Sequence, residues 1–469
     1  MLNIFLLGNG FDLHYCLPTG YADFLNTIDY LCKHKGDPIY TVGDVFRELA
    51  KDENNKIIRK SYDKYWSCYD FVELPNNELT KLVFTAEENK WFRYFIERKI
   101  KGNGWIDFEK EIKRVLSLID ETINEYACSQ ARSEERRHSS HIPTQSQSDI
   151  RIILVAFELG KFGKIEPEGD GRGGYKEYFV SENSEEVENY DSRDLKEFYH
   201  LNFDSGRFYF RPDLNCIVSE TPRLLSLNKE AIVDELLSSL RECSFLLTTY
   251  LKLFVENPLK NILKEGVVDL DEAFESDAIV VSLNYTRTYE LLYRYPNHDY
   301  DALDSYYEDI IQYGVSLPRV CHIHGITSSQ IVLGADSDSK DELNELDTMF
   351  IGFKKYYQRV IYKTDRNYLR LLQKIQDQQN IRFQLFVFGH SLDETDRDII
   401  IELFDLADSI TIFYLKQSDL EQYVRRLVSI YGKKEFDHFR VSKDLTFFHT
   451  DELNQNWRIL SSAKESSLI

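Results

Sequence analysis

The stretch that decides the fold is LNIFLLGNGFDL at residues 2–13. Its apolar half, Leu2 to Leu7, predicts a buried β-strand, and the glycine-containing half predicts a tight turn into a helix. Such a turn brings backbone N–H groups and a helix N-terminus to the carboxyl end of a strand, where a phosphate is favoured. Glycine at positions 8 and 10 permits positive φ angles and close approach of a ligand. A dinucleotide fingerprint would have a third glycine where Leu13 stands, so a plain turn capped by Asp12 remains an alternative.

Composition indicates a folded, globular chain. The 469 residues are 42% hydrophobic and 14% aromatic, enough for two or three domains with a large core. No run approaches the roughly 20 apolar residues of a membrane span, and residues 1–7 lack the features of a secretory signal, so a cytoplasmic location without membrane contact is expected. The seven cysteines are scattered and contain no CxxC pair, which argues against a disulfide framework or a zinc ribbon. A net charge of −22 makes nucleic acid an unlikely partner, although a local basic groove stays open.

The middle of the chain is predicted to be a mainly helical insertion. Helical spacing of apolar residues covers 21–32, 91–101, 108–126 and 227–255. Residues 129–148 have almost no apolar side chains and predict a mobile loop. Residues 151–225 mix apolar, glycine and aromatic positions, which predicts a small mixed subdomain of uncertain fold.

The last part of the chain returns to short apolar runs separated by helices. These runs predict strands at 278–283, 319–323, 331–333, 384–388 and 409–415. Together with the first strand they predict an α/β fold with a Rossmann-like parallel sheet. The expected domains are a discontinuous nucleotide-binding domain at 1–30 and 278–469, and the insertion at 31–277.

Polar residues follow three of the later predicted strands, and ligands gather at strand carboxyl ends in open α/β sheets. Asn284 follows the strand at 278–283 and offers an amide donor and a carbonyl acceptor to a ribose hydroxyl or a water. An asparagine that only satisfies a turn is the competing interpretation.

The second segment is Cys321-His322-Ile323-His324-Gly325. Side chains two apart on a strand share a face, so the two histidines are expected on one side. One of them is a candidate general base near neutral pH. A metal site is an alternative, with a third ligand from Asp336, Asp338 or a distant carboxylate, and structural hydrogen bonding is another. Gly325 would let a ligand approach the backbone, or it simply ends the strand.

The third segment, 388–396, leaves a buried strand through Gly389 and reaches a helix that begins near Asp396. Ser391 and its backbone are candidates for ribose or phosphate binding, whereas Asp393 and Asp396 also fit helix capping. Two further groups are interpreted as structural. Asp107 and Glu109 fit a helix start, and Lys354, Lys355 and Arg359 fit a solvated helix face better than a phosphate clamp.

With these blocks in order, the chain resembles the AbiH family of bacterial abortive-infection proteins. The resemblance rests on the segments at 7–13, 17–24, 284–286, 322–325, 333–334 and 389–396. It says little about residues 130–225. It implies a bacterial antiphage role.

The same blocks resemble, more distantly, the sirtuin-like NAD-binding fold. That resemblance implies that Gly8, Gly10 and Asp12 face the NAD phosphates and ribose, that Asn284 and His324 act at the nicotinamide ribose, and that Gly389 and Ser391 hold the adenosine half. Asn9, Thr286 and His390 depart from the sirtuin pattern, and the zinc cysteines are missing, so deacylation is disfavoured.

The leading hypothesis is an antiphage effector that hydrolyses NAD+ at the nicotinamide N-glycosidic bond, with His324 as base and Asn284 positioning ribose or water. NAD+ is then a substrate, and no bound prosthetic group or metal is expected. A phage-derived trigger and a homo-oligomer are possible partners. The alternatives are a metal-dependent nuclease or phosphoesterase using His322, His324, Asp336, Asp393 and Asp396, and a non-catalytic nucleotide-binding sensor. The candidate nucleotide-binding residues are Gly8, Asn9, Gly10, Phe11, Asp12, His322, Gly325, Gly389, His390, Ser391 and Asp396.

Overall fold

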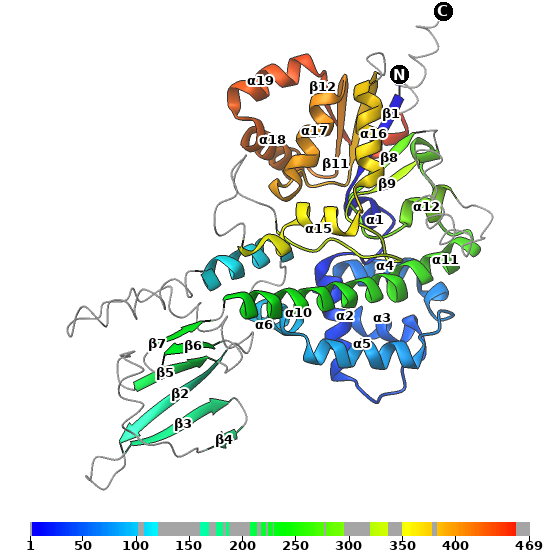
Figure 1. Ribbon diagram of the computed structural model, residues 1–469. Helices are drawn as coiled ribbons and strands as arrows, with labels where there is room; N and C mark the ends of the chain where they lie inside the picture. Colours follow the sequence, from blue (N-terminus) through cyan, green and yellow to red (C-terminus); the bar gives the residue numbers. More distant parts are fainter. Residues whose placement is uncertain are drawn as a thin grey trace, which may run out of the picture.

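The computed structural model describes residues 2–101, 107–120, 229–275, 278–294, 319–335, 349–377 and 382–455, and the backbone of six short strands between residues 160 and 227 (Figure 1). The loop predicted at 129–148 and the residues Asp336 and Asp338 lie outside this part. None of the helices in the described ranges is long and apolar enough to cross a bilayer.

The centre of the molecule is a six-stranded parallel sheet in the order β12-β11-β10-β1-β8-β9. Its strands are β1 (Leu2–Leu7), β8 (Ile279–Ser282), β9 (Val320–His322), β10 (Phe383–Phe388), β11 (Ser409–Tyr414) and β12 (Leu445–His449). The chain starts in the middle, steps outward through β8 and β9, and returns to the other side of β1 through β10. Numbered along the chain, this is the strand order of the dinucleotide-binding fold, and it confirms the predicted Rossmann-like α/β class.

Register brings four strand ends into one row. Leu7 pairs with Phe388 on one side and with Ser282 on the other, and Ser282 pairs with His322. The residues that follow β10, β1, β8 and β9 therefore leave the sheet at one edge. The strand order reverses between β1 and β10, so this edge includes the place where ligands bind in open α/β sheets.

Both faces of the sheet are covered, which explains why the central strands are apolar throughout. Ile4, Leu6 and Leu385 point to one face and pack with the C-terminal helices; Phe5 and Phe386 point to the other. The helices on the first face are α16 (Arg366–Asp377), α17 (Arg397–Leu406), α18 (Gln417–Tyr431) and α19 (Lys433–Ser442). The core on the second face continues without a break into the helical part of the chain.

The helical part lies beyond the edge where α1 (Gly10–His14) begins, with the long α10 running across it (Figure 1). It contains a helix over 108–120 and α2 (Tyr21–Lys33), α3 (Val42–Leu49), α4 (Lys56–Tyr69), α5 (Asn76–Glu88), α6 (Lys90–Lys101), α10 (Lys229–Tyr250) and α11 (Asn257–Lys264). A π-helical segment, Leu251–Glu256, joins α10 to α11. The helices predicted at 21–32 and 91–101 are confirmed. The short α12 (Thr288–Tyr293) and α15 (Lys355–Tyr362) follow later in the chain.

The remaining strands are antiparallel and lie apart from the main sheet (Figure 1). One sheet has the order β4-β3-β2-β5, and a separate pair is β6-β7. Their bounds are β2 (Gly160–Pro167), β3 (Tyr175–Ser181), β4 (Ser184–Glu186), β5 (Arg207–Pro212), β6 (Ile217–Thr221) and β7 (Leu224–Leu227). They fall within the region for which a small subdomain was predicted.

For the main sheet, one predicted strand is wrong and one strand was missed. Residues 331–333 belong to no strand. The side-chain amide of Gln358 takes the place of a strand partner: it donates to Leu333 O at 2.9 Å and accepts from Leu333 N at 3.0 Å. The missed strand is β12, an edge strand whose residues after Leu445 are only half-buried. An edge strand has a weak apolar pattern, which is why the sequence did not reveal it.

Candidate functional site

The turn after β1 and the turn after β10 pack directly against each other. Gly8 N donates to Phe388 O at 3.1 Å, and Gly10 N donates to Gly389 O at 2.7 Å. Gly389 has a φ of +68°, and a Cβ there would lie 2.3 Å from Phe11 N. The glycines thus allow two segments of the chain to touch. The expectation of bare amides for phosphate needs correction, because the N–H groups of Gly8 and Gly10 already donate to the protein's own carbonyls.

Two other residues of the first turn have structural partners. Asn9 Oδ1 accepts from Thr19 Oγ1 at 2.6 Å, which ties the turn to the start of the helical part. The ring of Phe11 is fully buried against Tyr15, Phe274 and Phe388. Phe11 was a candidate for nucleotide binding, but its ring belongs to the aromatic core and offers no face to a ligand.

Asp12 is a buried carboxylate in α1, the helix that follows β1, and it is bound by residues that follow β8. Thr286 Oγ1 donates to Asp12 Oδ2 at 2.6 Å, and Asn284 Nδ2 donates to Asp12 Oδ1 at 3.3 Å. Burial raises the pKa of Asp12 to about 7, although these hydrogen bonds oppose the rise. Asp12, Asn284 and Thr286 thus form one buried hydrogen-bonded group, a contact that was not predicted.

His322 at the end of β9 is held from both sides. Its Nε2 lies 2.6 Å from Glu290 Oε1, and its Nδ1 lies 3.3 Å from Asn284 O. Both partners are acceptors, so both ring nitrogens carry protons in this arrangement. Burial alone would lower the pKa of His322, but Glu290 and the carbonyl outweigh it and raise the pKa above its usual value. A histidine held as a cation is a positioning group for Asn284, not a base.

His324 has different surroundings. Strand β9 ends at His322, so His324 lies in the following turn and the two histidines do not share a strand face as predicted. His324 is 3% exposed, and its Nε2 lies 3.2 Å from Asp396 Oδ1 without the alignment of a hydrogen bond. Burial lowers the pKa of His324, against the pull of Asp396. The imidazole is therefore neutral at pH 7, the form a general base requires.

Asp396 joins His324 to His390, the residue that follows Gly389. His390 Nε2 lies 3.2 Å from Asp396 Oδ2, and His390 Nδ1 accepts from Leu392 N at 3.1 Å. Because Nδ1 accepts, the proton of a neutral His390 ring sits on Nε2 and points to the carboxylate. The loops after β9 and β10 thus meet at one carboxylate.

A lysine lies beside that carboxylate. Lys355 Nζ contacts Asp396 Oδ1 at 3.0 Å and Glu109 Oε1 at 2.7 Å, and the lysine is 1% exposed. Burial would raise the pKa of Asp396, but Lys355 and His324 outweigh it and hold the pKa well below its usual range. Asp396 is therefore ionised. Glu109, in the helix over 108–120, brings the helical part of the chain to the site.

The burial of Lys355 and Arg359 differs from what was predicted from the sequence. They were assigned to a solvated face, but α15 turns Lys355, Gln358 and Arg359 inward. The apolar residues of the same helix face outward, with Tyr356 65% exposed and Val360 and Ile361 also exposed. The sequence pattern indicates the opposite orientation, because polar positions 355, 358 and 359 share one helical face and an amphipathic helix ordinarily turns its apolar face to the core.

The remaining candidates lie at the margin of the cluster. Gly325 has a φ of +80°, and a Cβ there would lie 2.1 Å from Gln330 O, so the close approach is made by the protein's own backbone. Ser391 is exposed, and its carbonyl accepts from Arg426 Nη1 at 2.5 Å. Asp393 is bound by Lys110 at 2.8 Å and by Arg426 at 3.3 Å.

The histidines and carboxylates do not form a metal-binding arrangement within the described residues, where no group of three or more His, Cys, Asp or Glu side chains is placed to hold an ion. Lys355 contacts Asp396, Glu290 contacts His322, and Asp393 contacts two cations. Asp336, the proposed third ligand, lies outside the described residues. The geometry gives no support to the metal-dependent alternative.

Comparison with known proteins identifies one family. The family model described as "Bacteriophage abortive infection AbiH" matches residues 4–158 and 227–415, which is most of the chain. The match omits 159–226, the region of the small antiparallel sheets. No curated protein and no solved structure matches the chain.

Proposed function

The chain belongs to the AbiH family of bacteriophage abortive infection proteins, and from this premise we propose that it is an antiphage effector that cleaves NAD+ at the nicotinamide N-glycosidic bond. The observation that carries the proposal is that two buried groups, Asp12 with Asn284 and His324 with Asp396, follow adjacent strands at one edge of a sheet with dinucleotide-binding strand order. NAD+ is the ligand class that this strand order suits.

The proposed chemistry uses a neutral base beside a fixed carboxylate. Water attacks C1′ of the nicotinamide ribose, the C1′–N bond breaks, and nicotinamide leaves with the bonding electrons. His324 accepts the proton of the water, and Asp396, held ionised by Lys355, stabilises the imidazolium that forms. Asn284, held by Asp12 and His322, orients the ribose hydroxyls or the water.

The cluster is closed to solvent in this structure, since His324, Asp396, Asn284 and Lys355 are all buried. NAD+ can reach His324 only after the loops that follow β9 and β10 move apart. We therefore propose that the free protein turns over NAD+ slowly and that a phage-derived trigger opens the site. Such restraint suits an effector that depletes a metabolite its own cell needs.

The test is incubation of the purified protein with NAD+, with and without lysate of phage-infected cells, followed by measurement of nicotinamide and ADP-ribose. General base catalysis contributes about 100-fold or more, so His324→Ala should lower turnover in the triggered condition at least about 100-fold. His438→Ala, at an exposed histidine on α19, is the matched control and should turn over NAD+ like the wild type.

A folded His324→Ala protein with unchanged turnover would remove His324 as the base. NAD+ binding without turnover in every condition would instead identify a nucleotide-binding sensor. Turnover abolished by a chelator would point to the metal-dependent alternative.

A further inference from the structure

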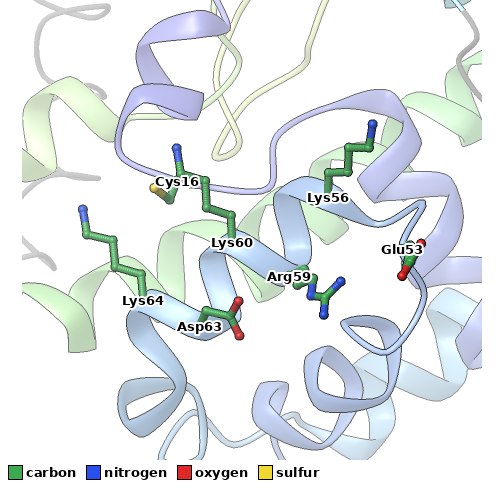
Figure 2. Close-up of a pocket in the computed structure, with 7 residues that line it drawn as sticks. All are labelled: Cys16, Glu53, Lys56, Arg59, Lys60, Asp63 and Lys64. Atoms are coloured by element: carbon green, nitrogen blue, oxygen red, sulfur yellow. The ribbon is translucent and has the colours of Figure 1, made fainter. Parts of the chain in front are cut away.

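A second feature lies away from the histidine cluster, on helix α4. A surface hollow of about 640 Å³ separates α4 from the segment that carries Cys16 (Figure 2). Figure 2 shows Lys60 extending toward Cys16, with Lys56 and Lys64 on the same side of α4 to either side of it. The residues that line the hollow are Cys16, Glu53, Lys56, Arg59, Lys60, Asp63 and Lys64.

The three lysines form a stripe along the helix. Positions 56, 60 and 64 are spaced by four residues, so they lie on one face and span about 12 Å along the axis. Like charges at this spacing repel each other and destabilise an isolated helix. Arg59 adds a fourth cation beside the stripe, while Glu53 and Asp63 contribute two carboxylates to the same lining.

The cations of the hollow differ from the lysines around them. Elsewhere in the helical part of the chain Lys33 pairs with Asp29 and Lys35 pairs with Glu87, each at 2.7 Å, and Lys51 pairs with Glu48 at 2.6 Å. In the described part of the chain, by contrast, Lys56, Arg59, Lys60 and Lys64 have no carboxylate within ion-pair distance, and Lys64 Nζ lies over the neutral ring of Tyr65, 5.1 Å from its centroid. Since acidic residues outnumber basic ones 79 to 57, a group of cations without carboxylate partners around a hollow is unexpected unless an anion neutralises it.

We propose that this hollow binds a linear phosphate-bearing anion, supplied either as an inorganic oligophosphate or as the backbone of a single-stranded nucleic acid. The spacing of the lysines suits several phosphates in a row better than one isolated phosphate. A double helix is too wide to enter a hollow of this size. The overall charge of −22 does not oppose the site, because a local cluster of cations sets the potential inside a hollow. The inference is independent of NAD+ cleavage.

The test measures binding of two probes to the full chain at 50 mM salt: tripolyphosphate by calorimetry, and a fluorescent 12-nucleotide oligothymidylate by anisotropy. The triple variant Lys56→Gln, Lys60→Gln, Lys64→Gln should weaken binding of the preferred probe at least tenfold. If the oligonucleotide is the ligand, the variant should also reduce the slope of log K against log salt by about 2. Which probe binds more tightly identifies the source of the phosphate.

Two controls keep the test specific. Lys374→Gln, Lys433→Gln, Lys434→Gln removes the same charge from exposed positions on α16 and α19 and should bind like the wild type. Asp63→Asn removes a carboxylate from the lining and should tighten binding of the same probe about threefold. Absence of binding by both probes, or equal loss in the two triple variants, would overturn the proposal.

Discussion

Burial of a single carboxyl, that of Asp12, makes the stability of the protein depend on pH. Its pKa is raised to about 7 in the folded state from about 3.8 in the unfolded chain. A carboxyl with a raised folded pKa stabilises the fold while protonated, so this stabilisation is present at low pH and is lost as pH rises toward 7. Asp12→Asn imitates the neutral acid, so this variant should keep the stabilisation as pH rises.

We therefore expect wild type to lose about 2–3 kcal/mol relative to Asp12→Asn between pH 5 and pH 8. Urea denaturation of the two proteins at both pH values measures the difference. Comparing the two proteins cancels the contribution of Asp23, another buried carboxyl whose pKa is raised to about 7. A difference that stays constant across this pH range would show that Asp12 does not titrate as described.

Gly389 lies where the turns after β1 and β10 touch, and its replacement should destabilise the fold. Gly389→Ala combines a positive φ with a Cβ that would lie 2.3 Å from Phe11 N, whereas Gly266→Ala has a φ of +66° with nothing within 4 Å. Gly266→Ala is the control, and it should lower the free energy of unfolding only by the backbone strain, about 1–2 kcal/mol. Gly389→Ala should cost at least about 2 kcal/mol more, because overpacking adds to that strain. Equal unfolding free energies for the two variants would mean that the turns are not in close contact.

At the scale of elements, α15 is inverted relative to an ordinary surface helix. Lys355→Met would leave Asp396 and Glu109 without their cation, so we expect a loss of about 3–5 kcal/mol at pH 8. Ile361→Gln, on the exposed face of the same helix, should change stability by less than about 0.5 kcal/mol. Hydropathy alone predicts the reverse order, so denaturation of both variants separates the two accounts. A Lys355→Met protein as stable as wild type would contradict the buried ion cluster.

The elements that could be predicted are those with strong local signals. The strands at 2–7, 279–282 and 383–388 are buried on both faces, so their apolar runs are continuous and visible in the sequence. The segment 331–333 is equally apolar, but a side-chain amide from α15 satisfies its backbone instead of a strand. The residues around 331–333 give no sign of this partner, because Gln358 lies 25 residues from Leu333 in the sequence.

Part of the candidate site could be predicted for the same reason, because some of its residues follow apolar strands. Asn284 and Gly389 follow strands buried on both faces, His324 follows the short edge strand β9, and parallel strands place their ends at one edge. Glu109 and Lys355 lie on helices far from any predicted strand end, and their buried contacts with Asp396 are tertiary. The structural reason for the glycines could not be predicted either, since the sequence does not show whether a ligand or another turn approaches them.

In the molecule as a whole, we propose that the ends of β1, β8, β9 and β10 together form one nucleotide site. The measurement that tests it most directly is a crystal structure with an NAD+ analogue whose nicotinamide–ribose bond cannot be cleaved, in the presence of the activating trigger. The account predicts the nicotinamide ribose within hydrogen-bond distance of Asn284 and His324, with the loops after β9 and β10 moved apart. A ligand bound elsewhere, with His324 still buried against Asp396, would contradict it.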